Sequence, residues 1–154
     1  MSNRLVAFIL GEQQYALPLT TVQRVVRMVE VTPLPKAPEV VLGVIDFQGN
    51  IIPVMSMRRR FGLPECETSL SDQFIVADTA TRRVALVVNS VTGVLERTTE
   101  KVTEAEKIVP GAQYVEGITR LEDGILFIHN LEHFLSKKEG EQLDGLLVQS
   151  AGRE

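Results

Sequence analysis

The 154-residue sequence lacks the features that mark secreted and membrane proteins. It has one cysteine, Cys66, so an internal disulfide is excluded and a reducing compartment is expected. The apolar run near its start, Leu5–Leu10, is too short for a signal peptide. No stretch approaches the roughly 18 apolar residues that a membrane helix needs. We therefore expect a cytoplasmic protein with no direct membrane insertion.

Positive charge is also scarce. Lysine and arginine number 16 against 20 acidic residues, and the only dense basic run is Arg58–Arg60. Nucleic-acid binding is therefore not expected. The run follows Ser56 on a short predicted helix whose inward positions are Met57 and Phe61, so we interpret the arginines as a solvated face. Binding of a phosphate or an acidic partner is the alternative.

Catalytic and metal-binding motifs are missing as well. The sequence has no G-x-S-x-G, P-loop or G-x-G-x-x-G pattern. Cys66 lies between Glu65 and Glu67, whose charges raise rather than lower a thiol pKa. His129 and His133 have the spacing of a helical metal site, but no cysteine or carboxylate completes it, so strand-end and surface histidines are expected. We predict no enzyme activity, no metal and no cofactor.

Short apolar runs bounded by Gly, Pro, Asn or Asp fill most of the chain, and each predicts a strand. The ten candidates are RLVAFIL, QYALPL, VVRMVEVTPL, VVLGVIDF, NIIPVMSM, QFIVADT, RRVALVV, TGVLERTTE, YVEGITRL and GILFIHNL. The charged segment TTEKVTEAEK, residues 98–107, reads as a connection or a single helical turn. The sequence therefore predicts a mostly-β protein.

Two blocks of the pattern occur twice in the same order. Residues 43–61 align without a gap with residues 117–135, and residues 15–26 align with residues 84–95. This indicates one structural plan used twice. Two half-barrels of about five strands each fit the length. The junction is expected in the polar segment 62–73.

Short helical turns are expected where strands end. Ser56 and Asn130 occupy matching N-cap positions, and Gly62 is expected to end the first of these helices. Thr20 and Asn89 are expected to cap single turns in the same way. The segment after Ser136 is polar except for LDGLLV, which predicts a short helix or a tail.

Four blocks of the sequence form a further pattern: FILGEQQYALPLTTVQRVVR, LPKAPEVVLGVIDFQGNIIPVMSMRRRFGL, RVALVVNSVTGVLE and VEGITRLEDGILFIHNLEHFL. Together they resemble the CheW family, the coupling proteins of bacterial chemotaxis. They occur in the family's order over about residues 5–135. The pairing of P-x-x-x-x-G-V-I-x-x-x-G-x-I-I-P-V with Y-A-x-P-x-x-x-V is specific.

The resemblance implies a mostly-β fold of two five-stranded, SH3-like β-barrels packed around a shared core, with short helices. It would make residues 1–154 a single domain, with subdomains of about 1–67 and 68–137 and a tail or short helix over 138–154. It also implies a scaffold without catalysis or cofactor. One surface would bind the regulatory domain of a CheA-type histidine kinase, and another would bind the helical hairpin tip of a chemoreceptor.

The family motifs also imply the contact residues. Kinase binding would fall on Val22, Arg24, Gly43 and Gln48, and receptor binding on Ile51, Val84 and Ala85. The alternative is structural: the apolar positions belong to the core, and the glycine serves a backbone conformation.

The sequence departs from the family pattern in two ways. Ser56 and Asn89 stand where aspartate is usual, and each keeps an N-cap oxygen. Arg24 stands for a usual glutamate and Gln48 for a usual arginine. If the family residues form an ion pair, this chain has lost both members of the pair together: position 48 is neutral and position 24 carries the opposite charge. We interpret the change as a rewritten partner surface.

The alternative to a coupling scaffold is a ligand-sensing or regulatory module that keeps the same fold outside the chemoreceptor array. Such a module predicts a closed apolar pocket.

Overall fold

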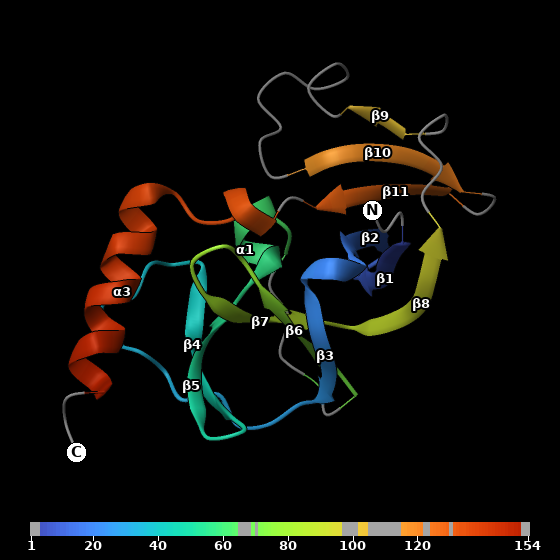
Figure 1. Ribbon diagram of the computed structural model, residues 1–154. Coiled ribbons are helices and arrows are strands. Elements are labelled where there is room, and N and C mark those ends of the chain that lie inside the picture. Colours follow the sequence, from blue (N-terminus) through green and yellow to red (C-terminus); the bar gives the residue numbers. More distant parts are fainter. Residues whose placement is uncertain are drawn as a thin grey trace.

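The computed structural model of the chain describes residues 4–64, 69, 71–96, 102–104, 115–121, 124–129 and 131–151 (Figure 1). The strands in these residues are β1 (Arg4–Leu10), β2 (Gln13–Pro18), β3 (Val22–Arg27), β4 (Val41–Phe47), β5 (Asn50–Met55), β6 (Gln73–Asp78), β7 (Arg83–Val88), β8 (Ser90–Glu96), β9 (Val102–Glu104), β10 (Val115–Leu121) and β11 (Gly124–His129). The helices are η1 (Leu19–Thr21), α1 (Met57–Phe61), η3 (Leu131–His133) and α3 (Lys137–Ala151).

The strands form two sheets, which confirms the mostly-β prediction. One sheet has the order β3-β6-β7-β5-β4 and the other the order β8-β1-β2-β11-β10-β9. The sixth strand, β9, lies in the segment interpreted from the sequence as a connection or a helical turn, so that interpretation is wrong for residues 102–104. The two sheets correspond to the two predicted five-stranded half-barrels. In the described residues no pairing of the outer strands closes either of them.

Each sheet takes strands from both halves of the chain. The β6–β7 hairpin of the second half pairs with β3 and β5 of the first half. Reciprocally, the β1–β2 hairpin of the first half pairs with β8 and β11 of the second half. The predicted boundary between residues 67 and 68 therefore separates the two repeats but not the two sheets. A subdomain cut from the sequence at this point does not correspond to a sheet.

The register of the two sheets is the same, residue for residue, under the sequence alignment. Val54 of β5 lies opposite Ala85 of β7, and Ile128 of β11 lies opposite Ala16 of β2. These are equivalent pairs in the two aligned blocks. The bulge between β3 and β6 recurs between β1 and β8, and the bulge between β4 and β5 recurs between β10 and β11. The predicted repeat is confirmed.

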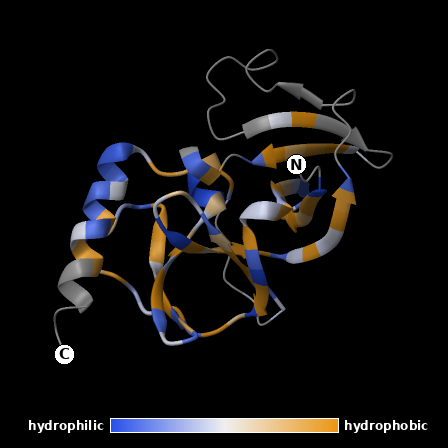
Figure 2. Cartoon of the chain, viewed as in Figure 1, coloured by the Kyte–Doolittle hydropathy of each residue, from blue (hydrophilic) through white to orange (hydrophobic). Residues whose placement is uncertain are grey.

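A shared core lies between the sheets. It buries side chains from β1, β2, β5, β6, β7, α1, η3 and α3, including Phe8, Leu17, Met57, Ile75, Leu86, Leu131 and Leu143. The rings of Tyr15 and Phe61 stack in it, 5.4 Å apart. A second hydrophobic cluster consists of buried side chains from β4, β5, β6 and β7 of the five-stranded sheet. Most hydrophobic residues accordingly lie on the strands, whereas α3 carries many hydrophilic ones (Figure 2).

The predicted helix boundaries are only partly correct. The Ser56 hydroxyl accepts a hydrogen bond from the Arg59 amide, and Gly62 ends α1 in the left-handed conformation, as expected. Thr20 caps nothing, because η1 begins after Pro18 without a side-chain cap. Asn89 is also not a cap, since β8 follows it directly. The predicted cap at position 130 lies outside the described residues.

Of the α1 arginines only Arg59 is exposed, so the interpretation of the run as a solvated face is wrong for Arg58 and Arg60. Arg58 donates to the side chain of Asn89, and Arg60 forms an ion pair of 2.6 Å with Glu139 of α3. Burial raises the pKa of Glu139, but hydrogen bonds from Arg60 and Ser136 outweigh it, and the pKa is lowered overall. The arginines therefore join α1 to neighbouring elements.

Gly43 in β4 is required by a close approach of the backbone. Thr32 exchanges two backbone hydrogen bonds with Val44, of 2.9 and 2.8 Å. This brings the segment before β4 across Gly43, where a Cβ would lie 2.2 Å from the Thr32 carbonyl oxygen. Real atoms do not approach so closely, and the carbonyl is held by its hydrogen bond. Only glycine fits here without displacing the segment.

We expect Gly43→Ala to lower the free energy of unfolding by about 2–3 kcal/mol, as overpacking against a fixed backbone does. The measurement is chemical denaturation at neutral pH. Gly145→Ala is the matched control, because Gly145 lies in α3 with nothing within 4 Å of the position that an added methyl group would occupy. That control should stabilise the protein slightly through helix propensity. Equal effects of the two substitutions would contradict the steric argument.

His129 is fully buried at the end of β11, so the expectation of a strand-end residue is confirmed but a surface position is not. Neither ring nitrogen has a hydrogen-bond partner among the described residues. Its ring meets the edge of Phe61 at 5.3 Å and lies 5.4 Å from the Phe134 ring. Burial lowers the pKa of His129 to about 3. In the other sheet the equivalent residue is Met55, which shows that the site suits a hydrophobic side chain.

The buried imidazole makes stability depend on pH. Below about pH 6.5 the unfolded chain protonates His129 while the folded chain does not until about pH 3, so stability falls by up to about 1.4 kcal/mol per pH unit as the pH falls through this window. Between pH 6.5 and pH 5 we expect the wild type to lose about 1.6 kcal/mol more than His129→Met. Urea denaturation at both pH values measures this. Parallel losses in the two proteins would show that the imidazole is not the cause.

Candidate partner-binding surfaces

The tip of the β4–β5 hairpin is a two-residue turn formed by Gln48 and Gly49. Their φ angles are 51° and 85°, so both residues are left-handed, as in a type I′ turn. The Asp46 carboxylate accepts a hydrogen bond of 2.9 Å from the Gly49 amide and stabilises the turn. The stretch GVIDFQGNIIPV, residues 43–54, predicts a polar turn of two or three residues between two strands, and this prediction is confirmed. The turn presents the Gln48 side chain to solvent.

The other sequence-predicted kinase residues are distributed differently. Arg24 is exposed on β3, an outer strand of the five-stranded sheet. Val22 is half-buried and packs against the shared core, and Gly43 is buried beneath Thr32. The structure thus leaves Arg24 and Gln48 accessible to a partner, whereas Val22 and Gly43 have structural roles. Kinase contact at all four positions stays a prediction.

The three sequence-predicted receptor residues also separate into two kinds. Ile51 on β5 is 56% exposed, which is unusual for a large apolar side chain. Val84 and Ala85 on β7 are only 2% and 0% exposed. Both belong to hydrophobic clusters, so the structure assigns them to the core rather than to an open surface. The sequence did not distinguish them from Ile51, because all three lie on apolar strands.

The second sheet carries a counterpart of Ile51. Ile125 of β11 occupies the equivalent position in the aligned blocks and is 51% exposed. The Nε2 atom of Gln13 donates a hydrogen bond of 2.7 Å to the backbone carbonyl of Ile125. The two exposed isoleucines therefore form a natural matched pair for testing which sheet contacts a partner.

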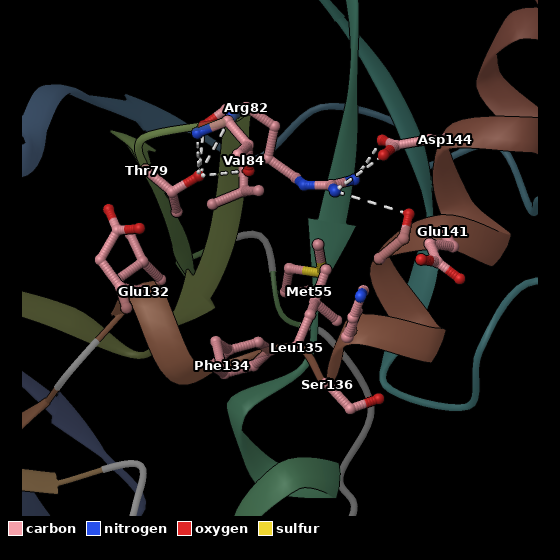
Figure 3. Close-up of a pocket in the computed structure, with 14 residues that line it drawn as sticks. Met55, Thr79, Arg82, Val84, Glu132, Phe134, Leu135, Ser136, Glu141 and Asp144 are labelled. Atoms are coloured by element: carbon pink, nitrogen blue, oxygen red, sulfur yellow. Dashed lines mark hydrogen bonds and ion pairs between the residues drawn. The ribbon is translucent and has the colours of Figure 1, made fainter.

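A pocket of about 240 Å³ opens beside α3 (Figure 3). Its lining combines apolar residues from β5, β7, η3 and the position after η3 with charged ones: Met55, Val84, Leu131 and Phe134 with Arg82, Glu132, Lys137, Glu141 and Asp144. Arg82 forms an ion pair of 2.7 Å with Asp144 across it. This is not the closed apolar pocket that a ligand-sensing module predicts. No local sequence pattern indicates the pocket, because its residues come from distant segments.

Among the described residues no three His, Cys, Asp or Glu side chains gather as metal ligands would. None of the helices in the described part of the chain has the length and hydrophobicity needed to cross a membrane. The candidate sites for partner binding are three exposed places on the five-stranded sheet: the outer strand β3, the β4–β5 turn, and Ile51 of β5 beside that turn.

Known proteins share this fold and sequence pattern. The family model for the CheW-like domain matches residues 4–139. The chain is 26% identical over 149 residues to the chemotaxis protein CheW of Treponema pallidum, covering 93% of this chain and 88% of that one. It is 26% identical over 141 residues to the chemotaxis protein CheW of Rhizobium meliloti, with 90% and 91% covered.

A solved structure agrees with these matches. The crystal structure of the scaffolding protein TtCheW from Thermoanaerobacter tengcongensis superposes with a TM-score of 0.81 at 27% sequence identity. The match covers 90% of this chain and 96% of that one. Both sheets and their exchange of strands lie within the matched family region. The chain belongs to the CheW family.

Proposed function

We propose that the chain is a non-catalytic scaffold that couples chemoreceptors to a CheA-type histidine kinase in chemotaxis signalling. The observation that carries the proposal is the family match over residues 4–139, together with a fold shared with a protein described as a scaffold. The relatives are named chemotaxis proteins. In this role the protein works in the cytoplasm and reaches membrane receptors only through its partners.

Exposed residues of the five-stranded sheet support coupling. The kinase regulatory domain would contact the β3 edge and the β4–β5 turn, where Arg24 and Gln48 are exposed. The receptor hairpin tip would contact the end of β5 at Ile51, whose exposed apolar surface favours a helical partner. A scaffold needs both contacts at once.

The purified chain should bind the regulatory domain of a CheA-type kinase from its own cell with a micromolar or lower dissociation constant. Isothermal titration calorimetry is the measurement, and the kinase fragment without its regulatory domain is the negative control. Such an interface has an apolar centre and a polar rim, so binding should show a negative heat-capacity change. Absence of binding to every CheA-like kinase of that cell would contradict the coupling role.

Receptor binding should depend on Ile51. We expect Ile51→Asp to weaken binding to a chemoreceptor cytoplasmic fragment by about tenfold or more, since losing a buried isoleucine costs about 1.5–3 kcal/mol. Co-sedimentation with receptor fragments measures the change. Ile125→Asp makes the same chemical change at the equivalent exposed position of the other sheet and should leave binding unaltered. Equal losses, or no loss for Ile51→Asp, would contradict this assignment.

A further inference from the structure

We propose that β3 binds an extended, acidic segment of the CheA-type kinase regulatory domain along its open edge, with Arg24 and Arg27 each facing a carboxylate. The inference rests on the proposed function and specifies the chemistry of the partner. It derives from the strand order, from the distribution of ion pairs and from a comparison of the two repeats.

The edge of β3 is available for strand pairing. In the described part of the chain β6 is the only strand that pairs with β3, so one side of its backbone remains open. An outer strand of this kind can accept a further strand, with main-chain hydrogen bonds supplying affinity. Val29, two residues beyond β3, is 49% exposed and adds apolar surface beside the edge.

The arginines of β3 differ from others in the described residues because nothing in this part of the chain pairs with them. Arg24 and Arg27 are exposed and have neither a hydrogen bond nor an ion pair there. Arginines elsewhere are engaged by the fold: Arg58 by Asn89, Arg60 by Glu139, Arg82 by Asp144 and Arg83 by Asp78. Two unpaired guanidinium groups on one open strand favour an acidic partner.

The internal repeat shows that these charges do not belong to the fold. β8 occupies the place of β3 in the other sheet and pairs with β1 in the same register. Its equivalents of Arg24 and Arg27 are Gly93 and Glu96. The equivalent outer strand β8 therefore forms without an arginine at either position. The charges on β3 are specific to that edge, as expected for a recognition feature.

The geometry constrains the partner's sequence. Beyond the bulge, Arg24 and Arg27 are three residues apart, so their side chains leave opposite faces of the strand about 10 Å apart. A strand added along β3 would match them with two carboxylates at the same three-residue spacing. The chain's net charge of −4 and the presence of only two such arginines disfavour nucleic acid or an anionic membrane as the occupant.

The test compares Arg24→Glu and Arg27→Glu with Lys138→Glu, an exposed residue of α3 whose substitution changes the net charge equally. The probe is the purified regulatory domain of the CheA-type kinase, and its dissociation constant is measured at low and high salt. Each β3 variant should weaken binding about tenfold at low salt, with a smaller difference at high salt because of screening. Lys138→Glu should bind as the wild type does. A carboxylate-to-lysine change in the kinase segment should restore binding of Arg24→Glu.

The outcomes are separable. If the wild type does not bind the kinase domain, the proposed function fails and this inference fails with it. If the wild type binds and the β3 variants bind equally well, only the β3 inference is overturned. The remaining possible occupant of the β3 edge is a second copy of the chain, and analytical ultracentrifugation of the chain alone measures such self-association. Self-association of the wild type that Arg24→Glu abolishes, without an effect on kinase binding, would assign the edge to a second copy and overturn the proposal.

Discussion

The fold depends on the reciprocal exchange of hairpins between the two halves of the chain. The parallel pairs β5–β7 and β11–β2 make this exchange, since each joins a strand of one half to a hairpin of the other. Parallel pairing requires a long connection, and the intervening chain supplies it. Neither half can complete its own sheet, and the shared core between the sheets takes side chains from both halves. The two sheets therefore fold as one cooperative unit despite the duplicated pattern.

This exchange also decides which surfaces remain free. Placing the β6–β7 hairpin in the middle of the five-stranded sheet leaves β3 and β4 at its edges. The edge at β4 is partly covered, because Thr32 forms a bridge to Val44 and requires glycine at position 43. The edge at β3 has no such cover among the described residues. The fold thus leaves open the strand that carries Arg24, while the turn that carries Gln48 is held by its own backbone geometry.

Local patterns in the sequence were sufficient for the repeat, the β4–β5 turn and the Ser56 cap. They are set by neighbouring residues, so they can be read without knowing the fold. The exchange of hairpins could not be predicted, because equivalent strands of the two repeats carry nearly the same apolar pattern and either pairing satisfies it. Burial of Val84 and Ala85 follows from that pairing, so the sequence could offer their place in the core only as an alternative to receptor contact. The partners of Arg58 and Arg60 come from the residue that precedes β8 and from α3, far along the chain.

In a duplicated fold each residue can be compared with the residue at the equivalent position of the other repeat. A difference between the two then reflects either packing in the core or contacts at the surface. Met55 and His129 lie at equivalent buried sites, so their difference changes how stability depends on pH rather than how a surface binds. Arg24 and Gly93 lie at equivalent positions on outer strands, where core packing imposes no requirement. An exposed edge is a risk for aggregation, and charged side chains reduce it. That role alone requires no particular sign of charge, and Glu96 would serve it as well as Arg27 does. Two arginines without intramolecular partners in the described residues therefore need a further reason, and a complementary acidic partner supplies it.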